Sequence, residues 1–247
     1  MSEPQPGQAS VVGRLLQEIS WERATHYRIG GRGRENVLTA EVLMALDFLP
    51  RMHFLGAVIG AAQGAEQARA VLISDIEIAS VSFLPGDLPL TPGKKSRNQR
   101  HVQPDALVMS TRSFVLVEAK RIRSNSFQPA QLAREYVAAM AHAENRLPIV
   151  LLLGVKPDVL VSGRGRMTIK EAVLGELVSV VEESGNSQLD VERLQSQIDD
   201  VFCWIPWEKV DEVVRTQEAA FTSSDPSITA SVRRLAGSIN DAIAWHA

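Results

Sequence analysis

The first strong apolar pattern in the chain repeats at helical spacing and comprises Leu38, Val42, Leu46 and Leu49. A repeat of three to four residues places these side chains on one face of a helix. Pro50 ends the pattern, because proline lacks the backbone donor that a continuing helix needs. The pattern predicts a helix of about four turns. It follows a glycine-rich stretch and carries Glu35 in its first turn.

Strand patterns follow this helix. Residues 70–83 are rich in β-branched apolar side chains, and the prolines and glycines of 84–93 come next. We expect a strand and then an extended loop. Two shorter apolar runs, Ala106–Met109 and Phe114–Val117, flank the polar residues 110–113. They predict an antiparallel hairpin.

The second half of the chain returns to helical spacing. A helix is expected over 128–144, and the continuous apolar run Pro148–Leu153 predicts a buried strand. Further expected elements are helices over 168–184, 207–220 and 227–245 and a short apolar run at Val201–Ile205. The order helix, strand, strand, strand, helix, strand predicts an α/β fold.

Composition and charge narrow the classes of protein that fit. The 247 residues are 45% hydrophobic, which is enough to bury one large domain or two small ones. A formal charge of −3 argues against a protein whose whole surface coats nucleic acid, so any anion site is local. The single cysteine, Cys203, excludes a disulfide framework within the chain and a Cys-based zinc site. No apolar run approaches the ~18 residues that span a bilayer, and we expect a cytoplasmic protein.

The domain organisation is expected to have three parts. Residues 1–10 are polar and rich in Pro, Gly and Gln, and are expected to form a disordered leader. A core is expected over 11–160, with a helical extension over 161–247 packed on it.

The chemistry concentrates at the ends of the predicted hairpin. Asp105 enters its first strand and Glu118 ends its second, so antiparallel pairing brings the two carboxylates side by side. Their repulsion becomes attraction if a hard divalent cation such as Mg²⁺ lies between them. Lys120 is two residues beyond Glu118 and shares its face of the strand. Its ammonium could activate a water and offset charge on a phosphate.

Pro104-Asp105, followed by Glu118-Ala119-Lys120 after an apolar run, resembles the PD-(D/E)xK nuclease superfamily. The resemblance covers about residues 34–154. It implies a restriction-endonuclease-like core, with a mixed β-sheet flanked by helices in αβββαβ order and extra C-terminal helices. It also implies that Asp105, Glu118 and the Ala119 carbonyl hold Mg²⁺, with Mn²⁺ as a substitute, while Lys120 assists attack of water on a phosphodiester.

Two flanking residues extend the resemblance. Glu35 begins a Glu-Asn-Val-Leu-Thr stretch like the one that carries a metal-site glutamate in many members, and would complete a second metal position. Glu41 is the competing choice. Gln131 occupies the place of a glutamine that positions the water or the backbone. Tyr136 departs by one residue from the Gln-x-x-x-Tyr form of the RecB-like branch, so that branch is not assigned.

A basic segment surrounds the motif. Eight basic residues and two acids lie between Lys94 and Arg123. The residues expected to contact a nucleic-acid backbone are Lys94, Lys95, Arg97, Arg100, Arg32 and Arg34. The alternative is that these basic stretches are ordinary solvated surface. Asp75 and Glu77, on alternate positions of the first expected strand, are expected to face solvent.

These features together predict a Mg²⁺-dependent nuclease. Its substrate is nucleic acid, with DNA favoured over RNA only by family analogy, in a restriction, repair or defence role. The alternative is a catalytically silent protein of the same fold that binds nucleic acid or acts as a scaffold. A glycosidase is a third hypothesis, and the sequence disfavours it. Its pair of carboxylates does not need Lys120, and sugar-binding sites use aromatic side chains, which make up only 5% of this chain. A homodimer or a partner subunit remains open.

Overall fold

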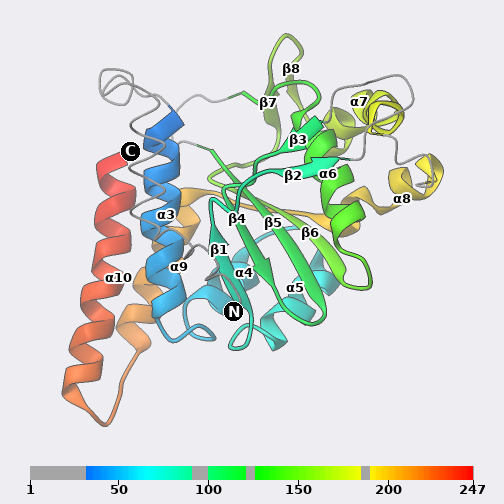
Figure 1. The fold of residues 1–247 in the computed structure, drawn as a ribbon. Coiled ribbons are helices and arrows are strands. Elements are labelled where there is room, and N and C mark those ends of the chain that lie inside the picture. The colour runs from blue at the N-terminus through cyan, green and yellow to red at the C-terminus, as the bar shows by residue number, and fades with distance from the viewer. Residues whose placement is uncertain (1–31, 91–99, 121–125, 185–189, 247) are drawn as a thin grey trace, which may run out of the picture.

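The computed structural model describes residues 32–90, 100–120, 126–184 and 190–246. The expected leader at 1–10 lies outside them. A five-stranded sheet with the order β1-β4-β5-β6-β9 forms the centre (Figure 1). Its strands are β1 (Ser80–Phe83), β4 (Ala106–Met109), β5 (Ser113–Ala119), β6 (Leu147–Leu153) and β9 (Phe202–Ile205). The sheet is mixed, because β1, β4 and β5 pair antiparallel whereas β5, β6 and β9 pair parallel.

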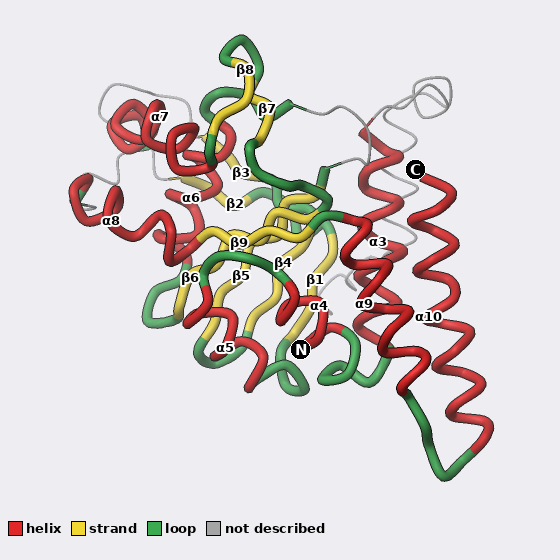
Figure 2. The backbone as a smooth tube through the Cα atoms, turned by 180° about the vertical axis from the view of Figure 1, so that it is seen from behind, coloured by secondary structure: helices red, strands yellow, loops and turns green. Residues whose placement is uncertain are grey.

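Helices cover both faces of this sheet (Figure 2). The first face packs against α3 (Arg32–Phe48), α4 (Leu55–Ala61), α5 (Glu66–Ser74), α9 (Trp207–Ala220) and α10 (Pro226–His246). The second packs against α6 (Gln131–His142), α7 (Ile169–Glu183) and α8 (Val191–Val201). Alternation along β5 serves both layers, since Val115 and Val117 join the first core and Phe114 and Leu116 the second.

Two small hairpins lie outside the central sheet. One pairs β2 (Leu88–Leu90) with β3 (Arg100–Val102), and the other pairs β7 (Val159–Val161) with β8 (Gly165–Met167). Residues on both sides of 160, the expected end of the core, build the same sheet and the same core. β9 extends the central sheet, and α9 and α10 pack in the same core as α3. No helix in the described ranges is long and apolar enough to cross a membrane.

The structure confirms most of the expected elements. The helix before Pro50, the hairpin of β4 and β5, the buried strand β6 and the apolar run at β9 all form. The expected helices over 168–184, 207–220 and 227–245 correspond to α7, α9 and α10.

The expected strand over 70–83 is wrong for most of its length. Residues up to Ser74 belong to α5, and only Ser80–Phe83 is a strand. Ala68, Leu72 and Ile76 are buried at intervals of four, so the helical period of the apolar positions outweighs the β-branched composition. The expected loop over 84–93 contains β2.

The solvent-facing strand position expected for Asp75 is also wrong. Asp75 follows the last turn of α5 and is buried. Glu77 is exposed as expected, although it lies in a turn, and its carboxylate accepts a hydrogen bond from the Met52 amide.

Candidate active site

Asp105 and Glu118 lie at the same end of the β4–β5 hairpin. Ala106 pairs with Val117, and continuing this antiparallel register by one residue places Asp105 opposite Glu118. The Asp105 amide donates to the Val117 carbonyl at 3.0 Å, and Asp105 Oδ2 accepts from the Ala119 amide at 2.7 Å. Side chains directly opposite in an antiparallel pair share a face of the sheet. This face is the one that α6 covers, because Leu107 and Leu116 pack in the α6 core.

Lys120 is held by both its side chain and its backbone. Its ammonium donates to Glu118 Oε1 and lies 4.9 Å from the centre of the Phe127 ring. Its amide donates to the Leu153 carbonyl at 2.8 Å, and its carbonyl accepts from Trp207 Nε1 at 2.7 Å. The side chains of Lys120 and Glu118 are only 11% and 7% exposed, so the ion pair is shielded from bulk water.

Gln131 reaches the same carboxylate from α6, the helix that covers this face of the sheet. It is the first residue of α6, and its side-chain Nε2 donates to Glu118 Oε1. Two residues distant in sequence, Lys120 and Gln131, therefore fix one oxygen of Glu118. The structure brings together four residues singled out from the sequence: Asp105, Glu118, Lys120 and Gln131.

Sequence reasoning missed Glu135, which lies one helical turn after Gln131. It is 2% exposed, and burial raises the pKa of its carboxyl well above the ordinary value, with the negative charge of Glu118 adding to the rise. The nearby Lys120 ammonium acts in the opposite direction on this pKa. The missed signal was the spacing, because a polar residue four positions after Gln131 in an alanine-rich helix shares its face.

The donor set fits a hard divalent cation. Mg²⁺ is commonly bound through one or two carboxylates, with waters and substrate oxygens completing its shell. Asp105 and Glu118 supply two carboxylates at one end of the hairpin. The carbonyl of Ala119, which directly follows Glu118 in the chain, is a further oxygen donor. Among the described residues, no group of three or more His, Cys, Asp or Glu side chains is arranged to hold a metal ion. An open site of two carboxylates is the kind that Mg²⁺ uses.

Several predicted residues lie outside the described part of the structure. Glu35, Arg32 and Arg34 belong to the first turns of α3, but their side chains are not described. The loop residues Lys94, Lys95 and Arg97 fall in the undescribed range 91–99. The second metal position and the loop contact with nucleic acid therefore stay predictions.

Two described arginines of the expected basic segment form ion pairs with acidic side chains. Arg100 Nη2 lies 3.2 Å from Glu183 Oε2, and Arg112 forms an ion pair with Asp75. Glu41, the competitor of Glu35, lies 3.6 Å from the ring nitrogen Nε2 of His246 on α10. This contact directs Glu41 towards the C-terminal helix.

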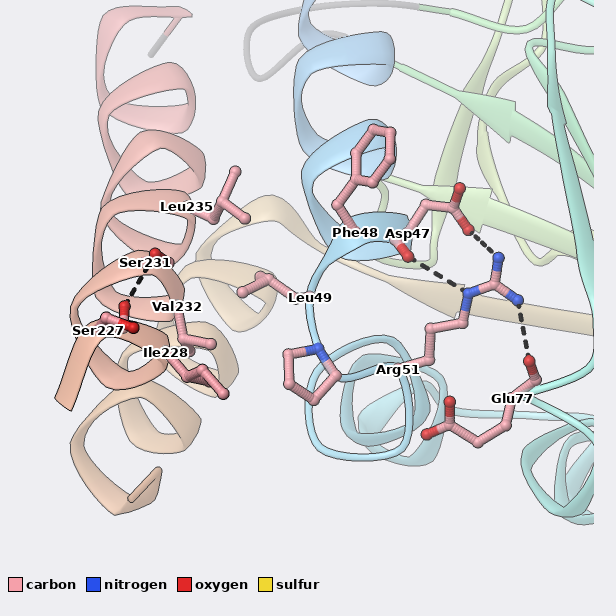
Figure 3. Close-up of a pocket in the computed structure, with 11 residues that line it drawn as sticks. Asp47, Phe48, Leu49, Arg51, Glu77, Ser227, Ile228, Ser231, Val232 and Leu235 are labelled. Carbon is pink, nitrogen blue, oxygen red and sulfur yellow. Dashed lines mark hydrogen bonds and ion pairs between the residues drawn. The ribbon is translucent and has the colours of Figure 1, made fainter. Parts of the chain in front are cut away.

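A separate groove of about 470 Å³ lies between the end of α3 and the first turns of α10 (Figure 3). Its apolar walls include Leu49, Val232 and Leu235, while the Arg51 side chain is held by Asp47 and by backbone carbonyls. None of the residues proposed for catalysis lines it. Cys203 is also apart from the site chemistry, because burial raises the pKa of its thiol to about 12.

Comparisons with protein-family models, with curated proteins and with solved structures give no match for this chain.

Proposed function

We propose that this protein is a Mg²⁺-dependent nuclease that hydrolyses phosphodiester bonds of nucleic acid, with DNA as the first substrate to test. One observation carries the proposal. The β4–β5 register sets Asp105 opposite Glu118, on the face where Lys120 and Gln131 both contact the Glu118 carboxylate. Two opposed carboxylates beside a lysine suit a metal-assisted attack on phosphate better than any other common chemistry.

The residues have distinct tasks in this proposal. Asp105, Glu118 and the Ala119 carbonyl would hold Mg²⁺. The bound ion would polarise the phosphate and make water a stronger nucleophile. The Lys120 ammonium, next to Glu118, would orient the attacking water and offset the negative charge that develops on the phosphate. Gln131 would keep the Glu118 carboxylate oriented.

We further propose that the fold is a restriction-endonuclease-like core. The elements α3, β1, β4, β5, α6 and β6 follow the order helix, strand, strand, strand, helix, strand. The candidate residues lie where this arrangement would need them, at the end of β5 and the start of α6. β9, α9 and α10 would then be additions to that core.

The direct test is incubation of the purified protein with plasmid, linear duplex, single-stranded DNA and RNA, each with Mg²⁺, Mn²⁺ or EDTA. We expect cleavage of at least one substrate with either metal and none with EDTA. Absence of cleavage from every substrate, with metal-independent binding retained, would favour the catalytically silent alternative.

Lys120→Ala should lower the single-turnover cleavage rate by about 10²–10³-fold, because the developing charge loses a pre-positioned cation. Binding of nucleic acid should change little. Lys170→Ala is the matched control, since Lys170 is an ion-paired lysine on α7, bonded to Asp199 on α8. Equal cleavage rates for Lys120→Ala and the parent would remove Lys120 from the mechanism.

A further inference from the structure

Glu135 is a buried acidic residue that the proposed mechanism does not use. It is 2% exposed, and its Oε2 atom has no hydrogen-bond partner among the described residues. Burying a carboxyl with an unsatisfied oxygen costs free energy, so its presence needs a physical explanation.

The position of Glu135 on α6 ties it to the candidate active site. Residues four apart on a helix are neighbours on one face, so Glu135 lies beside Gln131. The two side chains are hydrogen-bonded to each other, and Gln131 Nε2 also donates to Glu118 Oε1. A continuous chain of contacts thus runs from Glu135 through Gln131 to Glu118 and on to Lys120.

The electrostatic surroundings of Glu135 point to the same place. Its carboxyl interacts with the charges of Glu118, Lys120 and Asp105, which are all residues of the candidate site. The hydrogen bond with Gln131 acts to lower the pKa of this carboxyl, as a bond donated to a carboxylate does. The Gln131 amide nitrogen carries two hydrogens, so it can serve Glu135 while it donates to Glu118 Oε1.

A purely packing role explains Glu135 poorly. Apolar side chains of similar volume often replace buried ionic groups without loss of stability when the whole group of charges is replaced. The adjacent Tyr136 already serves the packing of α6, because its ring is fully buried and its hydroxyl donates to the Leu194 carbonyl at 2.6 Å. Glu135 is on the side of α6 that meets the site.

We infer that Glu135 is a positioning residue of the active site, which acts through the Gln131 amide to fix the Glu118 carboxylate and thereby sets the affinity of the site for a divalent cation. This inference rests on the proposed metal site. Residues that orient a metal ligand typically change metal affinity by 10–100-fold when they are removed.

The test measures Mn²⁺ binding by electron paramagnetic resonance of the free ion, without nucleic acid or turnover. Glu135→Met keeps the length of the side chain and removes its polar atoms, and it should weaken Mn²⁺ binding about 10–100-fold. Glu135→Gln should bind Mn²⁺ close to the parent value, because its amide oxygen can still accept a hydrogen bond from Gln131. Tyr136→Phe, which removes a buried hydroxyl from the neighbouring position, is the matched control and should bind like the parent.

A double-mutant cycle separates action through Gln131 from a direct effect. If Glu135 acts through the amide, Glu135→Met should have no further effect in a Gln131→Met background. Thermal melting is recorded for each variant, and Glu135→Leu replaces Glu135→Met if the latter melts below the assay temperature.

The outcomes for the inference and for the proposed function are distinct. Parent-like Mn²⁺ binding by Glu135→Met, with binding still lost in Asp105→Asn, would overturn the inference and leave the metal site standing. Unchanged Mn²⁺ binding by Asp105→Asn would overturn the metal site itself.

Discussion

At the scale of single residues, the polar contacts of the site converge on one atom. Glu118 Oε1 receives hydrogen bonds from both Lys120 and Gln131. A side chain fixed from two directions needs little reorganisation when a ligand arrives, which is the usual condition for strong electrostatic catalysis. Glu135 adds a buried carboxyl one turn along α6, and burial raises the pKa of this carboxyl, so we expect it to make the stability of the fold depend on pH.

Replacing Glu135 should make stability less sensitive to pH. The folded-state pKa of Glu135 is raised above its ordinary value, so the folded protein holds this proton more tightly than the unfolded chain. The residue therefore destabilises the fold increasingly as the pH rises above the unfolded value of 4.5 and towards the folded pKa. Glu135→Gln should raise the melting temperature at pH 8, by about 2–4 °C for each kcal/mol of penalty removed.

The measurement is thermal unfolding of the parent and of Glu135→Gln from pH 4 to pH 8. The difference between them should be small at pH 4 and should grow with pH. A difference that is constant across this range would show that the charge of Glu135 is not the cause.

At the scale of elements, the ends of three parallel strands hold the backbone of Lys120. The Lys120 amide donates to the carbonyl of Leu153 at the end of β6, and the Gly154 amide donates to the Ile205 carbonyl at 2.8 Å. The indole of Trp207, at the start of α9, donates to the Lys120 carbonyl. Gly154 has φ +81°. A Cβ there would lie 2.4 Å from the Lys120 oxygen and 2.1 Å from the Trp207 indole nitrogen, so no larger residue fits.

Trp207→Phe should destabilise the protein and slow cleavage. The substitution leaves the Lys120 carbonyl without its indole donor, a loss of about 1–3 kcal/mol for a buried acceptor. Circular dichroism melting and single-turnover cleavage measure the two effects. Trp204→Phe is the matched control, because its ring packs near Gly64 and is not bonded to Lys120. Equal effects of the two substitutions would show that the indole hydrogen bond is unimportant.

A second contact between elements joins the end of α5 to the β4–β5 turn. Arg112 Nε donates to Asp75 Oδ2 at 3.0 Å, and Ser110 Oγ donates to the same oxygen at 2.9 Å. The Arg112 hydrogen bond, more than any other contact, lowers the pKa of Asp75. A carboxylate with a lowered pKa stabilises the fold above its unfolded pKa, and this stabilisation is lost as the pH falls through the folded pKa.

Arg112→Ala should therefore lower the melting temperature at pH 7, and the difference from the parent should vanish near pH 2. Half of the Arg112 side chain is exposed, so the effect at pH 7 is expected to be modest and to weaken with added salt. Arg215→Ala is the control, because Arg215 pairs with Asp211 inside α9 alone. If Arg112→Ala melts at the same temperature as the parent at pH 7, the contact between α5 and the turn adds no stability.

The elements that sequence patterns predicted well are those with a simple period. The hairpin was found because short apolar runs flank a polar turn, and β6 was found because a parallel central strand is apolar on both sides. α5 was missed because Val71 and Ile73 favour strands locally, whereas tertiary packing selects the face of Ala68 and Leu72. β7 and β8 were missed because their few buried residues give no sustained pattern. α8 was missed because its segment is mostly polar, although Leu194, Ile198 and Val201 recur at helical spacing.

The candidate site was only partly predictable for a related reason. Asp105, Glu118 and Lys120 are close in sequence, so local strand geometry brings them together. Trp207 is 87 residues from Lys120 along the chain, and only the tertiary order of β5, β6 and β9 places its indole at the site. No local pattern could have predicted that contact.

At the scale of the whole molecule, the formal charge of −3 makes the location of basic residues decisive for binding to nucleic acid. Reversing the charges of Lys94, Lys95 and Arg97 should weaken binding to all sequences alike. Each lost phosphate contact contributes about 0.9 to the slope of log K against log salt on duplex DNA, so the slope should fall by about 3 in magnitude. Titrations across a salt series measure it.

The control for this salt series is reversal of Lys170, Lys209 and Arg215, which are ion-paired on α7 and α9. We expect their reversal to leave the slope nearly unchanged. An unchanged slope for the variant at Lys94, Lys95 and Arg97 would mean that this loop is ordinary surface, and Arg32 and Arg34 would be the remaining candidates.

The indole of Trp207 also has a consequence for the order in which the chain is made. Because the chain is made from its N-terminus, the residues from Asp105 to Lys120 emerge from the ribosome well before β9 and Trp207. During synthesis, the Lys120 carbonyl has no indole donor, and the parallel edge of β6 has no β9 to pair with. Because domains generally fold as units, we expect a nascent chain that ends before residue 202 to lack a finished site. For the nuclease proposed above, cleavage of nucleic acid would then begin only when nearly all of the protein has emerged.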